Sequence, residues 1–250
     1  MHSDFNTLAK RIVDILMIAY GDVDKVHHVL LKCVAKLKQF EPKHKPLIGL
    51  TTCRMELSGL YYFPKVIGPE LSADIIDYLN DQEWKGVSAS ETGRKVQQYG
   101  FEYDYSTRKG SEFKKVEDIP EFLLTLQKLG LDVIDDLKLD KCSLNQCIVN
   151  KYEPKQGISA HVDKPNFGPV IACFTLGSGT TMSFSRLDGD GVKHTYDKYV
   201  EPNSVYFMTG ESRYLWKHEI KPKMTDLVDS KKVRRTTRIS VTFRTVSKST

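Results

Sequence analysis

The 250-residue sequence predicts an α+β protein, with a β-sandwich or β-barrel core and flanking helices. Beyond residue 143, short runs of β-branched and aromatic residues alternate with turn signals, which is typical of sandwiches and barrels. Before residue 143, apolar residues recur at helical spacing in several stretches. A hydrophobic content of 40% over this length is sufficient for one large domain with its own core.

A helical N-terminal extension is predicted at residues 1–45. Two apolar stripes at helical spacing, separated by Gly21, indicate two amphipathic helices in a hairpin. Residues 41–46 hold two prolines among charged residues and indicate a linker. We therefore expect a main domain at residues 56–250.

Further elements follow in order along the main domain. Residues 59–67 indicate a short strand, and residues 69–84 indicate a helix with one apolar face. Residues 120–129 indicate a second helix, begun by Pro120 and ended by Gly130. The predicted strands of the core are Cys147–Tyr152, Val170–Leu176, Thr181–Ser185, Ser204–Met208, Tyr214–Ile220 and Arg238–Arg244.

Charge and cysteine content narrow the class of protein. The formal net charge is +5, and residues 213–250 hold 11 Lys and Arg against 3 Asp and Glu. This segment suggests an anionic partner, or only a solvated basic face. No stretch is apolar and long enough to span a membrane. Five cysteines without a CxxC pair, and a start unlike a signal peptide, favour the cytoplasm or nucleus over secretion.

Two histidines and an aspartate make a candidate metal site. His161 and Asp163 are two apart, so on a strand both side chains point to the same face. His218 lies on a later strand-like segment. Two His and one carboxylate form the facial set that leaves positions open on non-haem Fe(II). Each His, taken alone, is equally compatible with an ordinary core or surface histidine.

Parity on two other strands indicates an anion site. Arg238 and Arg244 fall on one face of their strand, and burying two arginines without anions is costly. A dicarboxylate suits the guanidinium fork, although an exposed edge strand would explain both residues as well. Asn150 and Tyr152 are also two apart and can donate hydrogen bonds to carboxylate oxygens.

The ordered set Asn150-x-Tyr152, His161-x-Asp163, His218 and Arg238-x5-Arg244 resembles the AlkB family of 2-oxoglutarate- and Fe(II)-dependent dioxygenases. The resemblance covers roughly residues 56–246 and is strongest at 143–246. Two strings, residues 150–163 and 208–218, resemble the branch that hydroxylates the wobble uridine of tRNA. That branch carries further domains for RNA recognition and methyl transfer, which are not seen in this sequence.

The resemblance implies a double-stranded β-helix, or jelly-roll, at about residues 143–246. It also implies Fe(II), 2-oxoglutarate and O2 as cofactor and co-substrates. His161, Asp163 and His218 would hold the metal. Arg238, assisted by Tyr152, would pair with the distal carboxylate of 2-oxoglutarate, while Asn150 and Arg244 would lie near its other end.

The segment before the core carries the candidate substrate residues. Tyr99, Phe101, Tyr103 and Tyr105 alternate, which indicates an aromatic strand face that is either core or a lid over an extruded base. We expect Arg94 and Tyr103 to face the substrate. Lys164, just after the metal motif, is a candidate for the pocket mouth. A basic run, Lys231, Lys232, Arg234 and Arg235, either contacts phosphates or is a solvated loop.

Several functions remain open from the sequence. The favoured one is oxidation of a modified or alkylated nucleobase, by wobble-uridine hydroxylation in tRNA or by N-demethylation of alkylated DNA or RNA. A protein-side-chain hydroxylase and a non-catalytic binding module with the same fold are the alternatives. Residues 1–40 could bind RNA or a protein partner.

Overall fold

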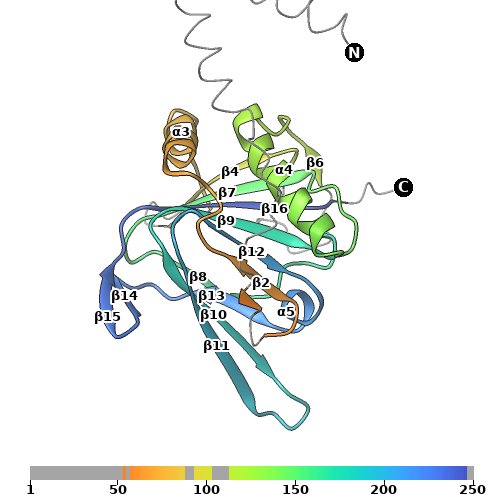
Figure 1. Ribbon diagram of the computed structural model, residues 1–250, viewed down its shortest axis with the longest axis vertical. Coiled ribbons are helices and arrows are strands. Elements are labelled where there is room, and N and C mark those ends of the chain that lie inside the picture. Colours follow the sequence, from red (N-terminus) through yellow and green to blue (C-terminus); the bar gives the residue numbers. More distant parts are fainter. Residues whose placement is uncertain (1–52, 55–56, 88–92, 103–112, 247–250) are drawn as a thin grey trace, which may run out of the picture. The chain divides into compact units, whose positions relative to one another are not determined.

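The computed structural model describes residues 53–54, 57–87, 93–102 and 113–246 (Figure 1). The predicted N-terminal extension at residues 1–45 lies outside the described residues, as do Tyr103 and Tyr105. In the described part, no helix is both long and apolar enough to cross a membrane.

Two antiparallel sheets form the core. The larger sheet has the spatial order β1 (Cys53–Arg54), β2 (Leu60–Phe63), β12 (Ser204–Met208), β9 (Ile171–Gly177), β16 (Arg238–Arg244), β7 (Gln146–Tyr152), β4 (Lys95–Tyr99) and β3 (Lys85–Gly86). The smaller sheet has the order β11 (Lys193–Val200), β10 (Thr180–Leu187), β13 (Lys217–Ile220) and β8 (Ile158–His161). Two separate strand pairs are β5 (Phe101–Glu102) with β6 (Lys114–Lys115) and β14 (Thr225–Val228) with β15 (Lys231–Arg234).

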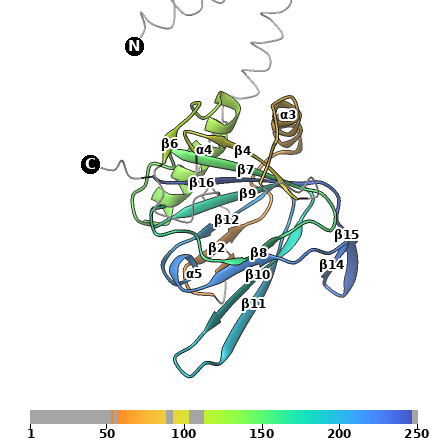
Figure 2. The same ribbon diagram turned by 180° about the vertical axis from the view of Figure 1, so that it is seen from behind.

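Helices α3 (Pro69–Asn80) and α4 (Glu121–Asp136) lie over the outer face of the larger sheet (Figures 1 and 2). A one-turn helix, α5 (Gly210–Tyr214), joins β12 to β13. The predicted sandwich with flanking helices is therefore confirmed in the described residues.

Strand β9 shows how this arrangement creates both a core and a cavity. Every residue from Ile171 to Leu176 is buried, because the strand is covered on both faces. Ala172 and Phe174 point towards α4, where they lie near Gly130. Ile171 and Cys173 point the other way and line a cavity between the two sheets. One face of β9 thus packs under α4, and the other face belongs to the apolar cluster between the sheets and to the cavity within it.

Helix α4 differs from the prediction, because it continues through Gly130 to Asp136. A Cβ at residue 130 would lie 3.2 Å from Leu144 Cδ1 and 3.7 Å from Ala172 Cβ. The glycine therefore permits close packing of the helix on the sheet and does not end the helix. Helix α3 also differs, since it ends at Asn80 and not at Trp84.

The predicted aromatic face at residues 99–105 is wrong in its described part. Strand β4 ends at Tyr99, and Gly100 has a φ of 75°. A side chain at residue 100 would also meet the Asn145 carbonyl oxygen. This break sends Phe101 into β5, where it packs against the small apolar cluster of Phe167 and Val246. Similarly, the predicted strand Tyr214–Ile220 begins only at Lys217, after α5.

The packing of Phe174 yields a stability prediction. This side chain is fully buried and makes an edge-to-face contact with Phe243, with ring centroids 6.0 Å apart. Phe174→Ala should lower the free energy of unfolding by about 3–5 kcal/mol in urea denaturation, because it leaves a cavity under α4. Leu124 lies on α4 but is 42% exposed, so Leu124→Ala should change the free energy of unfolding by less than about 0.5 kcal/mol. Equal effects of the two substitutions would contradict this packing.

Candidate active site

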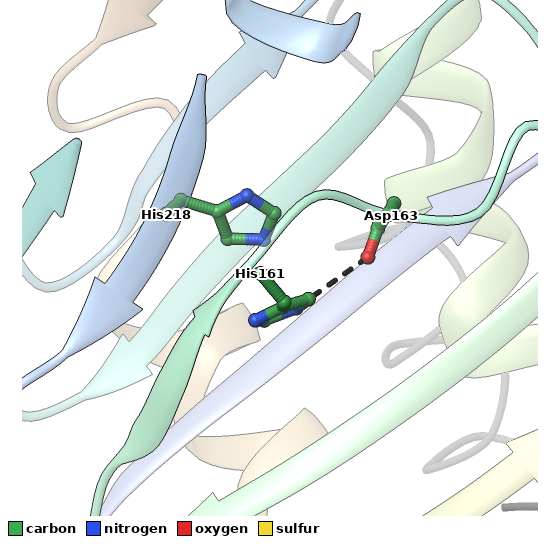
Figure 3. A group of neighbouring side chains, drawn as sticks. All are labelled: His161, Asp163 and His218. Carbon is green, nitrogen blue, oxygen red and sulfur yellow. Dashed lines mark ion pairs between the residues drawn. The ribbon is translucent and has the colours of Figure 1, made fainter. Parts of the chain in front are cut away.

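Strand pairing brings the two predicted metal histidines together. His218 on β13 is the cross-strand partner of His161 on β8, and their ring centroids are 4.3 Å apart. Asp163 follows two residues later, beyond the end of β8, so the prediction that it lies on the strand is wrong. The ligand atoms of the three residues all lie within 4.8 Å of one another. Figure 3 shows the three side chains converging from β13, β8 and the loop after β8.

Both histidines present a lone pair to the centre of this group. Nδ1 of His161 lies 2.7 Å from the Ser159 carbonyl oxygen. Because a carbonyl only accepts hydrogen bonds, Nδ1 carries a proton, and Nε2, which lies 3.6 Å from Asp163 Oδ1, is the nitrogen available to a metal. Burial lowers the pKa of His218 from 6.5 to about 4, so this imidazole is neutral at physiological pH. The pair therefore fits a divalent metal.

Asp163 completes the group as an ionised carboxylate. Burial disfavours its charge, but the Arg244 guanidinium and the two histidines hold the pKa of this carboxyl well below its usual range. Nη1 of Arg244 lies 3.6 Å from Oδ2 of Asp163, and its Nε donates a hydrogen bond of 2.9 Å to Gln146 Oε1. The guanidinium also stacks on Phe167, 3.8 Å from the ring centroid. Arg244 is thus fixed on three sides.

Arg213 on α5 holds the loop that carries Asp163. It is 1% exposed, and its guanidinium donates to the carbonyl oxygens of Asp163 (2.8 Å) and Lys164 (2.6 Å). It also donates to Phe167 (2.9 Å) and, more weakly, to Gly168 (3.4 Å). Phe167 forms an isolated bridge with Val246, but Asp163 and Lys164 lie outside any strand. At these two residues the Arg213 side chain supplies the hydrogen bonds that a strand partner would supply.

A cavity of about 450 Å³ opens next to the metal group. Arg238, 3% exposed, reaches it from β16 and donates a 3.0 Å hydrogen bond to Thr175 Oγ1. Its guanidinium lies 5.5 Å from the Tyr152 ring centroid, and its buried Nε has no hydrogen-bond partner in the described residues. A buried guanidinium with an unsatisfied donor fits an anionic ligand.

The structure places nine of the ten sequence-predicted site residues around this cavity. They are Arg94, Asn150, Tyr152, His161, Asp163, Lys164, His218, Arg238 and Arg244. Tyr103 lies outside the described residues. Arg94 is joined directly to the predicted co-substrate residues, because its Nε donates a 2.9 Å hydrogen bond to Asn150 Oδ1.

Sequence reasoning missed four residues of the site: Gln146, Thr175, Tyr206 and Arg213. Gln146 continues the even-numbered face of β7 that holds Asn150 and Tyr152, so extending the parity argument by two steps would have found it. Thr175 and Tyr206 lie on β9 and β12, which are buried on both faces. In such strands both faces are largely apolar, so the sequence does not show which residues point into the cavity. Arg213 has no periodic signal, since it lies in a one-turn helix.

Comparison with known proteins agrees with this geometry. A family model described as 2OG-Fe(II) oxygenase superfamily matches residues 59–244. An uncharacterized protein of Acanthamoeba polyphaga mimivirus is 32% identical over 197 residues, which cover 77% of this chain and 87% of the relative. The chain therefore belongs to the 2OG-Fe(II) oxygenase superfamily, and it is a dioxygenase that uses Fe(II), 2-oxoglutarate and O2.

Within this superfamily the chain is AlkB-like. The Alkylated DNA repair protein ALKBH8 homolog of Arabidopsis thaliana is 28% identical, over 80% of this chain and 61% of the relative. The tRNA (carboxymethyluridine(34)-5-O)-methyltransferase ALKBH8 of Mus musculus is 31% identical, over 69% of this chain but only 26% of the relative. The solved structure of OsALKBH1 has a TM-score of 0.57 at 19% identity, covers 75% of this chain and 96% of that one, and supports the predicted jelly-roll fold.

The buried state of His218 yields a pH prediction for the metal-free protein. The unfolded chain binds a proton at this residue below about pH 6.5, whereas the folded chain binds it only near pH 4. Stability should therefore fall as the pH drops through this window, by up to about 3 kcal/mol. Asp163 does not oppose the trend, because its lowered pKa affects stability only at still lower pH.

The measurement is urea denaturation in the presence of a chelator at several values between pH 4.5 and 7. His218→Asn should show a shallower dependence of unfolding free energy on pH than the natural protein. Identical slopes for the two proteins would contradict the assignment of a neutral, buried His218.

Proposed function

We propose that this protein oxidises a nucleobase in RNA, with the side chain of the tRNA wobble uridine as its preferred target. The observation that carries the proposal is the position of Arg94, a cationic side chain in the wall of the cavity that the metal group also lines. The cavity volume lies in the range of small-molecule sites and accommodates more than a small dicarboxylate. The names of the plant and mouse relatives, which refer to alkylated DNA and to a tRNA uridine, support a nucleic-acid substrate.

In this proposal His161, Asp163 and His218 hold Fe(II), with Asp163 kept in place by Arg213 and Arg244. Bound iron, with 2-oxoglutarate and O2, supplies the oxidising power that attacks a substrate C–H bond. His161, Asp163 and His218 would supply the protein ligands of the metal, in the set that on non-haem Fe(II) leaves positions for other ligands. The protein's task is to hold the two reactants in line there and to exclude water.

The co-substrate would lie between the metal group and Arg238. The guanidinium of Arg238, including its unsatisfied Nε, is suited to bind the distal carboxylate of 2-oxoglutarate. Tyr152 packs on the same guanidinium and assists it. Asn150 and Arg244 lie on the same wall and would contact the end nearest the metal.

The substrate base would enter from the side of Arg94 and Lys164. Arg94 connects the co-substrate residues with the place proposed for the substrate base. Asn150 holds its Nε, and the remaining N–H groups of the guanidinium can donate to an acceptor on the base. The backbone of Lys164 is held by Arg213, which gives the pocket mouth a fixed edge.

N-demethylation is a second candidate function. The Probable RNA/DNA demethylase ALKBH6 of Danio rerio is 24% identical, and this chain spans 86% of that relative. Hydroxylation of an N-methyl group gives a product that collapses and releases formaldehyde, whereas hydroxylation of a carbon side chain leaves a stable alcohol. The two candidates therefore differ in their products.

The decisive experiment is mass spectrometry of nucleosides from tRNA treated with the protein, Fe(II), 2-oxoglutarate and ascorbate. The proposal predicts a gain of one oxygen on the wobble uridine and no formaldehyde, and Asp163→Ala should abolish this product. A methylated DNA or RNA oligonucleotide serves in parallel. Demethylation of that oligonucleotide with untouched tRNA would overturn the proposal in favour of the second candidate.

The role of Arg238 yields a quantitative prediction. Arg238→Ala should weaken 2-oxoglutarate binding by about 30-fold or more, because a buried carboxylate loses its charged partner. Arg238→Lys should restore part of the affinity, since it keeps the charge but not the fork. Arg186→Ala is the matched control, because Arg186 pairs with Glu211 away from the co-substrate. Calorimetric titration with Mn(II) in place of Fe(II) measures all three, and unchanged affinity in Arg238→Ala would refute the role.

A further inference from the structure

The β14–β15 hairpin presents three cations that the proposed reaction does not use. We call Lys231, Lys232 and Arg234 the hairpin cations; all three are exposed. Register pairs Lys232 with Leu227 and Arg234 with Thr225, so these four side chains share one outward face. Lys231 pairs with Val228 and lies on the other face, where it is exposed next to the turn. None of the three cations forms an ion pair with any described residue. Asp229 at the turn is the exposed acid of the hairpin.

The base of the hairpin is fixed by a buried ion pair. Arg235 donates to both carboxylate oxygens of Asp226, at 2.6 Å each, and its Nη1 donates to the Lys221 carbonyl oxygen at 2.8 Å. Asp226 also accepts a hydrogen bond from the Thr181 backbone on β10. Arg235 is 6% exposed, so the prediction that it belongs to an exposed basic run is wrong. Its charge is neutralised internally, and the hairpin is held on the smaller sheet by it.

Contacts along the chain connect this hairpin to the rim of the cavity. The Lys223 carbonyl oxygen, just before β14, accepts a hydrogen bond from the Lys155 backbone N–H at 3.2 Å. In the same loop, Gln156 Nε2 donates to the Gly93 carbonyl oxygen at 3.1 Å, next to Arg94. Lys155, Lys221 and Lys223 are exposed along this path. Figures 1 and 2 show the hairpin on the opposite side of the domain from α4.

We propose that the hairpin cations bind the phosphate backbone of the RNA whose base enters the cavity. The inference rests on the proposed function, and it assigns the substrate's backbone to one defined surface. Unpaired cations on a rigid support attract phosphates through counterion release, which gives salt-dependent affinity without sequence preference. Lys155 and Lys223 continue the positive surface from the hairpin towards the loop that contacts Gly93, beside Arg94. Lys221 lies on the same path and pairs with Glu219 at 3.8 Å.

The test is fluorescence anisotropy with a labelled tRNA anticodon stem-loop at a series of salt concentrations. Lys231→Gln, Lys232→Gln and Arg234→Gln together should weaken binding by about 10–100-fold at ~0.1 M salt and reduce the slope of log affinity against log salt by about 2–3. Lys231→Arg with Lys232→Arg should keep natural affinity. The matched control replaces Lys114, Lys138 and Lys141, exposed cations near β6 and the end of α4, with Gln.

The outcomes separate the two proposals. The control triple variant should bind like the natural protein, and all variants should retain thermal stability and RNA-independent turnover of 2-oxoglutarate. Natural slope and affinity in the hairpin triple variant would overturn the hairpin surface and leave the proposed function standing. Failure of the natural protein to bind any RNA would overturn both. Equal or tighter binding of a single-stranded DNA of the same length would overturn the commitment to RNA.

Discussion

Strands β8 and β13 pair in the register that sets His161 opposite His218, and the metal site depends on this pairing. A shift of one residue would turn one histidine to the other face of the sheet, because side chains alternate along a strand. The ladder cannot fix the third ligand, since β8 ends at His161. Asp163 is placed instead by its loop, whose carbonyl groups are bound by Arg213. The metal group therefore depends on two features: the pairing of β8 with β13, which places the histidines, and the buried Arg213, which places Asp163.

Buried arginines have two different roles in this fold: one stabilises a loop, and the other is suited to bind a ligand. The donors of Arg213 are used on backbone carbonyls, so its charge stabilises local structure. Arg238 has a hydroxyl and an aromatic ring as neighbours but no carboxylate in the described residues, which leaves its charge uncompensated. An uncompensated buried charge is costly, and an anionic ligand would remove the cost. The same residue type can therefore indicate either a structural clamp or a ligand site, and the partners decide which.

The sequence was informative where side chains alternate along a single strand that faces the cavity. Arg238 and Arg244 on β16, and Asn150 and Tyr152 on β7, were predicted to share faces by parity, and the structure places all four on the cavity wall. Parity failed where the backbone leaves the strand. Gly100 ends β4 through its positive φ and divides the aromatic run. The prediction that Gly130 ends its helix was also wrong. In sequence, a glycine that permits close packing of a helix on a sheet cannot be distinguished from a glycine that ends a helix.

The basic C-terminal segment shows why net charge alone is weak evidence for a partner. Arg234 and Arg235 are adjacent in sequence, yet one is exposed on the hairpin and the other is buried on Asp226. Three residues later, Arg238 turns into the cavity. Within five positions the chain thus directs one cation to solvent, one to an internal carboxylate and one to a ligand pocket. The chain leaves β15 after Arg234 and enters β16 at Arg238, and this change of strand gives each charge a different partner. Only the outward fraction of the excess is therefore available for an RNA backbone.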